Sequence, residues 1–379
     1  MKKTYRNFAG IYFFYYFALA AISALIAPYL VEIGLSGVQI GSITGTGALV
    51  GVIATPVWGN ICDRIGKNKI LLYILLLGSS SISVFILFRR YYLYILLIYA
   101  VFFVFHNPIF AIMDSYTLKF DYEFGNIRLW GSIGYAIGVF ITGLIVGNYG
   151  LHYIFYVYSM GGIIAFLFLR NITKEEDKAI QCHGSTRGKD LFYNKKYVLF
   201  VIASFCTQGP MLAHNTYFSL LYTKVGGTIA GVGAVLMLFC LSEAPFMKIF
   251  AKVDGEKLIE KMFIVLLVIS ASRWFIYSLE PTVNVLIASF LLHGISNGAF
   301  IVTSIIYIAK ITKKENRVTA LSLYSALSLG LANMFCQYAG GIILDQYGPG
   351  GVYVLFTLLN VIAVALFIVL MYLKKEIIE

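Results

Sequence analysis

Two residues of opposite charge stand inside apolar sequence in the first half of the chain. Asp114 lies near the end of one very apolar segment, and Arg128 lies near the start of the next. If both segments cross a membrane, the two charges lie about one helical turn inside the same face on neighbouring helices. Charged groups at that depth are costly unless they pair or face water, so they mark functional sites by default. Asp114 and Arg128 are therefore candidates for solute recognition.

A second set of ionisable residues is spread over three apolar segments of the second half. Glu243 is followed two residues later by Pro245, and no base precedes it locally, so Arg273 and His293 are its available partners. A carboxylate that alternates between holding a proton and pairing with an arginine is what proton coupling requires. A static structural ion pair is the alternative, because intramembrane charges also form such pairs. We expect these residues to handle proton coupling.

Further side chains could complete a solute site. Histidines could bond in a cavity or relay protons, because imidazole titrates near neutral pH, although an internal hydrogen bond explains a lone histidine equally well. Tyrosine and tryptophan within a span could stack on a ring of the solute. The remaining substrate-binding candidates are Asn107, Trp130, Tyr135, His214, Tyr217 and Asn297.

Composition places the chain in a membrane. Of its 379 residues, 60% are hydrophobic and 12% are charged, whereas soluble domains are about half apolar and a quarter charged. Apolar stretches of about 18 residues or more recur along the chain, which indicates helices rather than the alternating strands of a barrel. The net charge of +11 would suggest nucleic acid in a soluble protein. Here membrane orientation explains it better, and we expect no nucleic-acid partner.

Twelve membrane-spanning helices are predicted, at about 8–31, 40–60, 70–88, 92–117, 127–147, 151–170, 197–222, 228–250, 261–279, 282–308, 318–343 and 352–373. An even number places both termini on one side of the membrane. Lysine and arginine are concentrated at the termini and in the loops after even-numbered spans, and the opposite loops hold only Arg89, Arg90 and Lys224. The positive-inside rule therefore predicts cytoplasmic termini. Pro108 is expected to bend the fourth span.

The longest polar stretch, 171–196, is predicted to be a cytoplasmic loop between two six-helix halves, 1–170 and 197–379. The halves resemble each other, because GLIVGNYG closes the fifth span and GIILDQYG closes the eleventh. DRIGK from Asp63 and DGEK from Asp254 form a weaker echo. This indicates internal duplication, which is typical of secondary transporters with a midplane site between the halves.

Motifs for other chemistries are not found. The five cysteines have no ligand spacing, so neither a metal nor a disulfide is assigned. The sequence holds no GxxxxGK[ST] phosphate-binding loop, no hydrolase triad and no metal cluster. We therefore expect a protein that is not an enzyme and uses no cofactor. It would be driven by an ion gradient, with H⁺ preferred over Na⁺, or else by the gradient of the solute itself.

The sequence between the second and third predicted spans resembles the loop signature of the major facilitator superfamily. That pattern has a glycine, an acid followed by a base, another glycine and then basic positions, here Gly59, Asp63, Arg64, Gly66 and Lys67. The resemblance covers the whole chain, given twelve spans and a central loop, and it implies an all-α fold. A contact among these charges could latch one conformation; the plainer alternative is that they only end and orient two helices.

Within that superfamily, the words NP…MDS and RLWGSIGYAIG resemble the branch that holds lactose permease and 3-phenylpropionate transporter-like proteins. The resemblance assigns solute binding to Asp114, its paired Arg128 and the stacking aromatic Tyr135. It also matches Arg273 and His293 to that branch's arginine and histidine in the ninth and tenth spans.

Two departures from that branch concern its acidic residues. The proton-carrying acid that follows His293 by three positions is Ser296 here, and the two acids of the seventh span are replaced by Gly209 and Leu212. The coupling network therefore cannot be copied over. The word around Glu243 is closer to the phenylpropionate transporter side.

These observations predict a proton-coupled importer of a small organic solute, working by alternating access as a multi-pass monomer in the bacterial inner membrane. A sugar or nucleoside would use Asp114 as acceptor, whereas an aromatic carboxylate would use Arg128 or Arg273 as counter-ion. Asp114 slightly favours a neutral polyol, because a fixed anion disfavours an anionic solute. A drug or metabolite efflux antiporter and a non-transporting membrane sensor are the alternatives.

Overall fold

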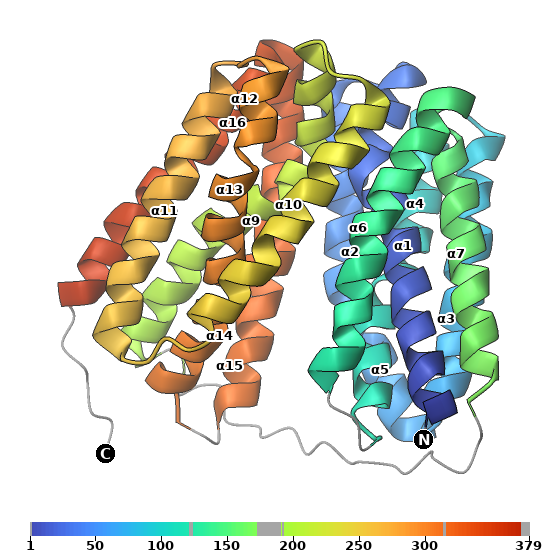
Figure 1. Ribbon diagram of the computed structural model, residues 1–379, viewed down its shortest axis with the longest axis horizontal. Helices are drawn as coiled ribbons and strands as arrows, with labels where there is room; N and C mark the ends of the chain where they lie inside the picture. Colours follow the sequence, from blue (N-terminus) through green and yellow to red (C-terminus); the bar gives the residue numbers. More distant parts are fainter. Residues whose placement is uncertain (1, 121–123, 173–190, 192, 314–315, 373–379) are drawn as a thin grey trace. The chain divides into compact units, whose positions relative to one another are not determined.

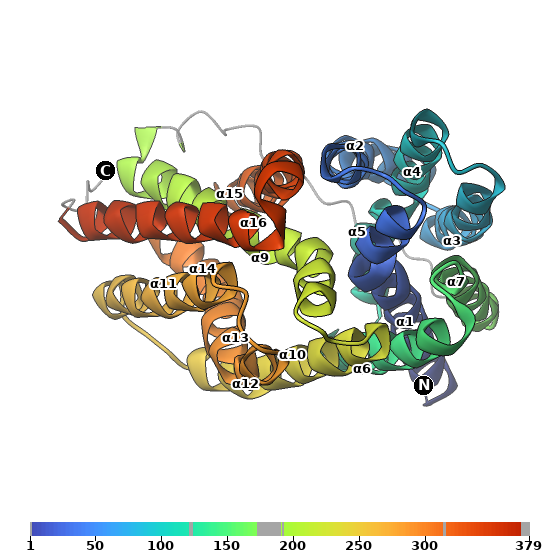
Figure 2. The ribbon, with the colours of Figure 1, turned by 90° about the horizontal axis from the view of Figure 1, so that it is seen from above.

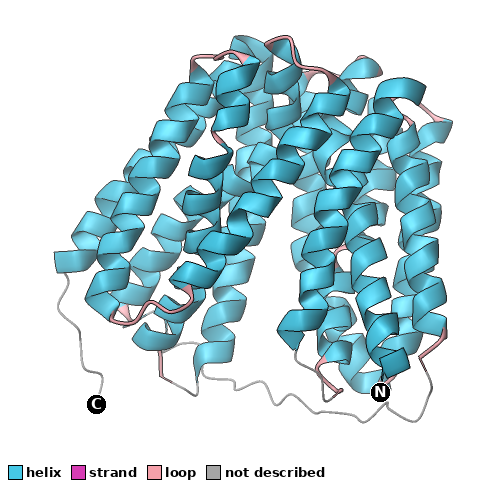
Figure 3. Cartoon of the chain, in the orientation of Figure 1, coloured by secondary structure: helices cyan, strands magenta, loops and turns pink. Residues whose placement is uncertain are grey.

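The structure is a computed structural model that describes residues 2–120, 124–172, 191, 193–313 and 316–372, except for the side chains of residues 2, 3, 63 and 318. Within these ranges the regular structure is helical and no strand occurs (Figure 3). The predicted all-α fold is confirmed.

The helices before the central polar stretch account for the first six predicted spans (Figure 1). They are α1 (Lys2–Glu32), α2 (Gly37–Ile65), α3 (Asn68–Phe85) with the 3₁₀ turn η1 (Ile86–Phe88), α4 (Tyr92–His106), α5 (Pro108–Thr117), α6 (Phe124–Tyr149) and α7 (Tyr153–Arg170).

The helices after that stretch account for the other six. They are α9 (Lys195–Lys224), α10 (Ile229–Phe250), α11 (Glu256–Ser278), α12 (Val283–Ala288), α13 (Phe290–His293), the π-helical turn η3 (Gly294–Gly298), α14 (Ala299–Ile311), α15 (Arg317–Tyr324), the π-helical segment η5 (Ser325–Leu331) and α16 (Ala332–Tyr372).

Ten helical segments of the described chain are long and apolar enough to cross a membrane. The difference from the predicted twelve has two sources. One segment, Thr319–Tyr372, is 54 residues long and holds both the eleventh and the twelfth predicted spans. The ninth predicted span lies in α11, which carries charged residues in its first two turns and Arg273 further on, and it is not among the ten.

Contacts between Cα atoms group the chain into two compact units, with a boundary inside α10. Most of the predicted central loop, 171–196, lies outside the described residues. Unit 1 comprises Met1–Cys182 and Gly227–Met237, and unit 2 comprises His183–Gly226 and Leu238–Glu379.

Each unit has its own packing centre. In unit 1, α1 packs against α6 and α7, and α3 packs against α4 and α7. In unit 2, α16 packs against α9 and α11, as Figure 2 shows from above. Buried aromatic side chains fill both cores, among them Phe8, Tyr12 and Tyr116 in unit 1 and Phe200, Phe263 and Tyr307 in unit 2.

Small residues allow the close approach of α1 and α6. A Cβ atom on Gly134 would lie 2.2 Å from the carbonyl oxygen of Phe13, and one on Gly138 would lie 2.7 Å from the Cα of Phe17. These are backbone atoms and cannot move aside cheaply. Glycine at these positions therefore sets the distance between the two helices.

Gly134→Ala is expected to destabilise unit 1, because its methyl group would force α1 and α6 apart. Overpacking of this kind costs about 1–3 kcal/mol. Thermal unfolding of the purified protein in detergent should show a lower midpoint for this variant. Gly59→Ala is the matched control, because a Cβ atom there meets nothing within 4 Å. An equal midpoint for both variants would contradict this account of the packing.

Pro108 and Gly348 mark two interruptions of the helices. Pro108 begins α5 directly after α4 ends at His106, but Asn107 between them keeps helical dihedrals, with φ −65° and ψ −40°, so the bend expected in the fourth span stays a prediction. In α16, Gly348 has a φ of 70° and divides the helix into two arms. A positive φ favours glycine, because a Cβ atom clashes with the backbone there.

Hydrogen bonds to Glu280 hold the second arm of α16, which follows Gly348. The carboxylate of Glu280, itself at a φ of 50°, accepts a hydrogen bond from the backbone N–H of Gly350 at 3.0 Å and one from Lys224 Nζ at 2.6 Å. Glu280 thus satisfies an orphan N–H at the start of the second arm, as a capping residue does. The ends of α9 and α11 are tied to that arm.

Candidate solute and proton sites

Asp114 is the centre of a polar cluster in unit 1. Its Oδ1 accepts a hydrogen bond from Tyr12 on α1 at 2.6 Å, and its Oδ2 accepts one from Arg128 on α6 at 3.1 Å. The side chains of Arg128 and Asp114 are 54% and 24% exposed. The structure thus brings together the two charges of the sequence prediction, and both stay open enough to meet a solute.

Tyr12 is not among the site residues predicted from the sequence. Its hydroxyl reaches Asp114 across 102 positions of the chain. Tyr16, one turn further along α1, stacks on Tyr12 with ring centroids 6.3 Å apart. The signal was present as the spacing of four residues between the two tyrosines, which places them on one face of a helix. The density of aromatic residues around them in this span concealed it.

The other solute-binding candidates of unit 1 differ in their surroundings. Tyr135 shares a 3.0 Å hydrogen bond with Ser23 of α1. Asn107 donates a 3.4 Å hydrogen bond to Thr55 of α2. Trp130 is 40% exposed. Tyr135 and Asn107 are therefore held by neighbouring helices, whereas Trp130 is available for an external contact.

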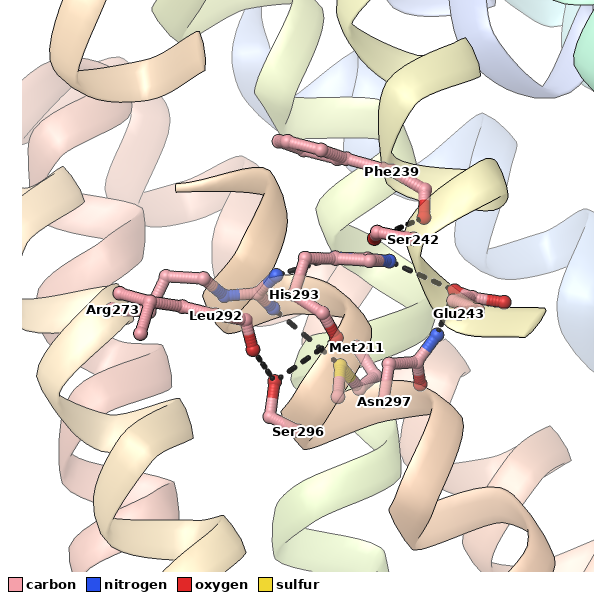
Figure 4. A network of polar contacts seen from close by, with 9 residues as sticks. All are labelled: Met211, Phe239, Ser242, Glu243, Arg273, Leu292, His293, Ser296 and Asn297. Atoms are coloured by element: carbon pink, nitrogen blue, oxygen red, sulfur yellow. Dashed lines mark hydrogen bonds and ion pairs between the residues drawn. The ribbon is translucent and has the colours of Figure 1, made fainter. Parts of the chain in front are cut away.

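In unit 2, three charged or titratable side chains form a chain of contacts (Figure 4). Arg273 on α11 hydrogen-bonds Nδ1 of His293 on α13, and Nε2 of His293 hydrogen-bonds Oε1 of Glu243 on α10 at 2.9 Å. Arg273 is fully buried, and Glu243 is 22% exposed. This series of contacts therefore leads from the buried guanidinium group of Arg273 to the partly exposed carboxylate of Glu243.

The direction of these hydrogen bonds follows from the donors. A guanidinium group can only donate, so Nδ1 of His293 must accept from Arg273. The remaining proton of a neutral imidazole is then on Nε2, which donates to Glu243. A neutral imidazole thus separates one positive and one negative charge, and the cluster is balanced while Glu243 is ionised.

The approach of α10 to η3 places Glu243 against these partners. A Cβ atom on Gly298 would lie 2.7 Å from the carbonyl oxygen of Glu243, and one on Gly294 would lie 2.5 Å from that of Ser242. Only glycine fits at this distance. The π-helical turn that carries both glycines is a form often found at functional sites.

Two neighbouring residues of η3 have different partners. Asn297, predicted to bind solute, donates its side-chain amide to Oε1 of Glu243 at 2.5 Å. Ser296, which replaces the acid of the related branch, donates to the carbonyl oxygen of Leu292 at 2.7 Å and to that of His293 at 3.3 Å. The acid that contacts His293 in this chain therefore comes from α10.

The two remaining solute-binding candidates lie in the core of unit 2. His214 is completely buried, and its Nδ1 is 2.9 Å from the hydroxyl of Tyr353. Tyr217 is equally buried and donates a 2.6 Å hydrogen bond to the carbonyl oxygen of Gln337. In this arrangement both side chains support the packing of α9 on α16, which differs from the solute contact expected from sequence.

The structure explains one of the missing acids of the seventh span. A Cβ atom on Gly209 would lie 2.8 Å from the carbonyl oxygen of Ala332 and 2.8 Å from the sulfur of Cys336. No side chain fits there, so an acid could not be accommodated where α9 meets α16.

The loop signature after the second span is mostly helical. Gly59, Asp63 and Arg64 lie in the last two turns of α2, which corrects the expectation that they belong to a loop. Gly66 ends α2 with a φ of 66°, and Lys67 directly precedes α3. The side chain of Asp63 lies outside the described residues, so its role in a latch stays a prediction.

The echo of this signature in the second half forms an ion pair. Asp254, between α10 and α11, contacts the ammonium group of Lys310 on α14. The hydrogen bond from Lys310 lowers the pKa of the Asp254 carboxyl below its usual value. The ion pair of Asp254 therefore connects the loop between α10 and α11 to α14 within unit 2.

The fold and these clusters define a helical membrane transporter. The MFS_1 like family model matches residues 5–355 of the chain. The chain belongs to this family, as the resemblance to the major facilitator superfamily predicted.

Relatives and solved structures agree with this assignment. The chain is 31% identical to the uncharacterized transporter YwbF of Bacillus subtilis, over 99% of this chain and 96% of that protein. It is 30% identical to the maltose permease of Geobacillus stearothermophilus, over 96% and 93% of the two chains. The crystal structure of the nucleoside transporter NupG superposes with a TM-score of 0.86, at 16% identity, over 98% of this chain and all of that one. The protein is thus a multi-pass membrane transporter of a small solute and not an enzyme.

Proposed function

We propose that the protein imports a neutral, polyhydroxylated solute, most simply a sugar, together with a proton. Asp114, Arg128 and Tyr12 would bind solute hydroxyl groups, and Glu243 would carry the proton with His293 and Arg273 behind it. Transport would proceed by alternating access across the bacterial inner membrane, driven by the proton gradient without a cofactor.

The observation that carries this proposal is the state of Glu243. Its carboxylate is partly exposed, and it is joined through a neutral histidine to a fully buried arginine. Protonation would leave the charge of Arg273 uncompensated, so the protonated form is costly and suits a transient intermediate. The similarity to maltose permease supports the sugar class.

The ion pair in unit 1 supports a neutral solute. Asp114 and Arg128 neutralise each other at 3.1 Å, so a charged solute would gain a partner only by separating them. A sugar hydroxyl can donate to the carboxylate and accept from the guanidinium group while the pair stays intact.

Proton-coupled uptake is tested with the purified protein in proteoliposomes. With maltose outside and no initial pH gradient, the lumen should acidify as labelled maltose enters, because each sugar would bring a proton with it. Sucrose, uridine and 3-phenylpropionate complete the panel. Uptake of a panel member without proton movement would refute coupling. If no member is taken up and a deletion strain becomes drug-sensitive, efflux replaces import.

A further inference from the structure

The two oxygens of the Glu243 carboxylate have different surroundings. Oε1 accepts hydrogen bonds from Nε2 of His293 at 2.9 Å and from Nδ2 of Asn297 at 2.5 Å. In Figure 4 the other oxygen points away from both donors, and it has no hydrogen-bond partner among the described residues. A proton is therefore added to Oε2, because both donors already occupy Oε1.

The charged and titratable groups around Glu243 come from three helices. His293 on α13 contacts it directly, Arg273 on α11 lies behind His293, and Cys240 precedes it by about one turn on α10. The charge of Arg273 is fixed, and Arg273 also holds His293 in its neutral form. Asn297 is the remaining direct donor to the carboxylate, and its amide does not titrate.

We propose that Asn297 positions the Glu243 carboxylate and sets the pH at which Oε2 takes up a proton. This inference rests on the proposed role of Glu243 as proton carrier. A hydrogen bond from an amide to a carboxylate favours the ionised form, so Asn297 would delay proton uptake to lower pH. Asn297 would then belong to the coupling machinery of unit 2 and not to the solute site.

The local backbone supports a fixed position for this amide. Asn297 lies within η3 and directly precedes Gly298, where an added Cβ atom would lie only 2.7 Å from the carbonyl oxygen of Glu243. The two residues are therefore held together by the contact between their helices as well as by the hydrogen bond. Replacement of the Asn297 amide would therefore change the hydrogen bonding of the Glu243 carboxylate without requiring α10 and η3 to separate.

Infrared spectroscopy of the purified protein in proteoliposomes tests this proposal without a solute. The C=O stretch of protonated Glu243 is assigned by its loss in Glu243→Gln and is followed while the pH is varied. In Asn297→Leu, which has a similar size and no donor, the midpoint should rise by about one pH unit. Ser296→Ala is the matched control and should leave the midpoint unchanged, because Ser296 bonds only carbonyl oxygens of its own helix turn.

Asn297→Asp provides a second variant in case the leucine disturbs folding. A second carboxylate at this position would share a proton with Glu243, so the midpoint should rise further than in Asn297→Leu. Midpoints equal to that of the unaltered protein in both variants would overturn the role of Asn297 while leaving Glu243 as carrier. If Glu243→Gln removes no titrating band between about pH 4 and pH 10, the carrier role itself fails, and this inference fails with it.

Discussion

Glu243→Gln should abolish accumulation of solute against its gradient while preserving exchange of solute across the membrane. Glutamine keeps the size and the acceptor oxygen that His293 and Asn297 contact, but it cannot release or bind a proton in the transport cycle. Steps in which the transporter changes conformation with solute bound should continue. We expect the steady-state accumulation ratio for maltose to fall at least about tenfold, toward equilibration, since a tenfold ratio corresponds to about 1.4 kcal/mol of coupled driving force.

This result is measured as net uptake and as counterflow in the same proteoliposomes. Ser242→Ala is the matched control, because Ser242 is the neighbour of Glu243 on α10 and, within the part of the chain that the structure describes, its hydroxyl donates to the carbonyl oxygen of Phe239 alone. It should accumulate maltose normally. A Glu243→Gln protein that still concentrates the sugar would show that the proton travels by another route.

Asp114→Ala should weaken solute binding more than any other single change in unit 1. The substitution removes the acceptor of both Tyr12 and Arg128 and leaves a guanidinium group without its counter-ion. Loss of a hydrogen bond to a charged group costs about 1.5–3 kcal/mol, which raises KM by roughly 10- to 150-fold. The KM is obtained from initial rates of maltose uptake at a fixed proton gradient.

Two further variants separate recognition from folding. Tyr12→Phe should raise KM less than Asp114→Ala, because the carboxylate and Arg128 remain in place. Asn148→Ala on α6 should have no effect, since among the described residues the Asn148 side chain bonds just the carbonyl oxygen of Leu144 in its own helix. An unchanged KM in Asp114→Ala would remove this cluster from the solute site.

The sequence predicted the helices and the charged centres because both depend on residue type. Apolar length alone defined twelve segments, and each coincides with helix in the described chain. An acid and a base inside neighbouring apolar segments have few ways to be satisfied, so the pairing of Asp114 with Arg128 could be expected. The same reasoning linked Glu243 to His293 and Arg273.

Other parts of the sites depend on contacts that sequence does not encode locally. The hydroxyl of Tyr12 on α1 meets Asp114 on α5 across 102 positions of the chain, a contact that only the packing of the helices brings about. Asn297 turns toward Glu243 from a π-helical turn, whose extra residue changes which side chains share a face. His214 and Tyr217 were expected at the solute, since nothing in their types reveals that α16 covers them.

The turn at Gly348 has a mechanical consequence. Because the change of direction in α16 takes place at one residue, its two arms are joined directly, without a loop between them. Glu280 connects the second arm to the ends of α9 and α11 through Gly350 and Lys224. A loop inserted after Gly348 is therefore expected to loosen the connection between the two arms of α16 at a place outside the polar residues of the proton site.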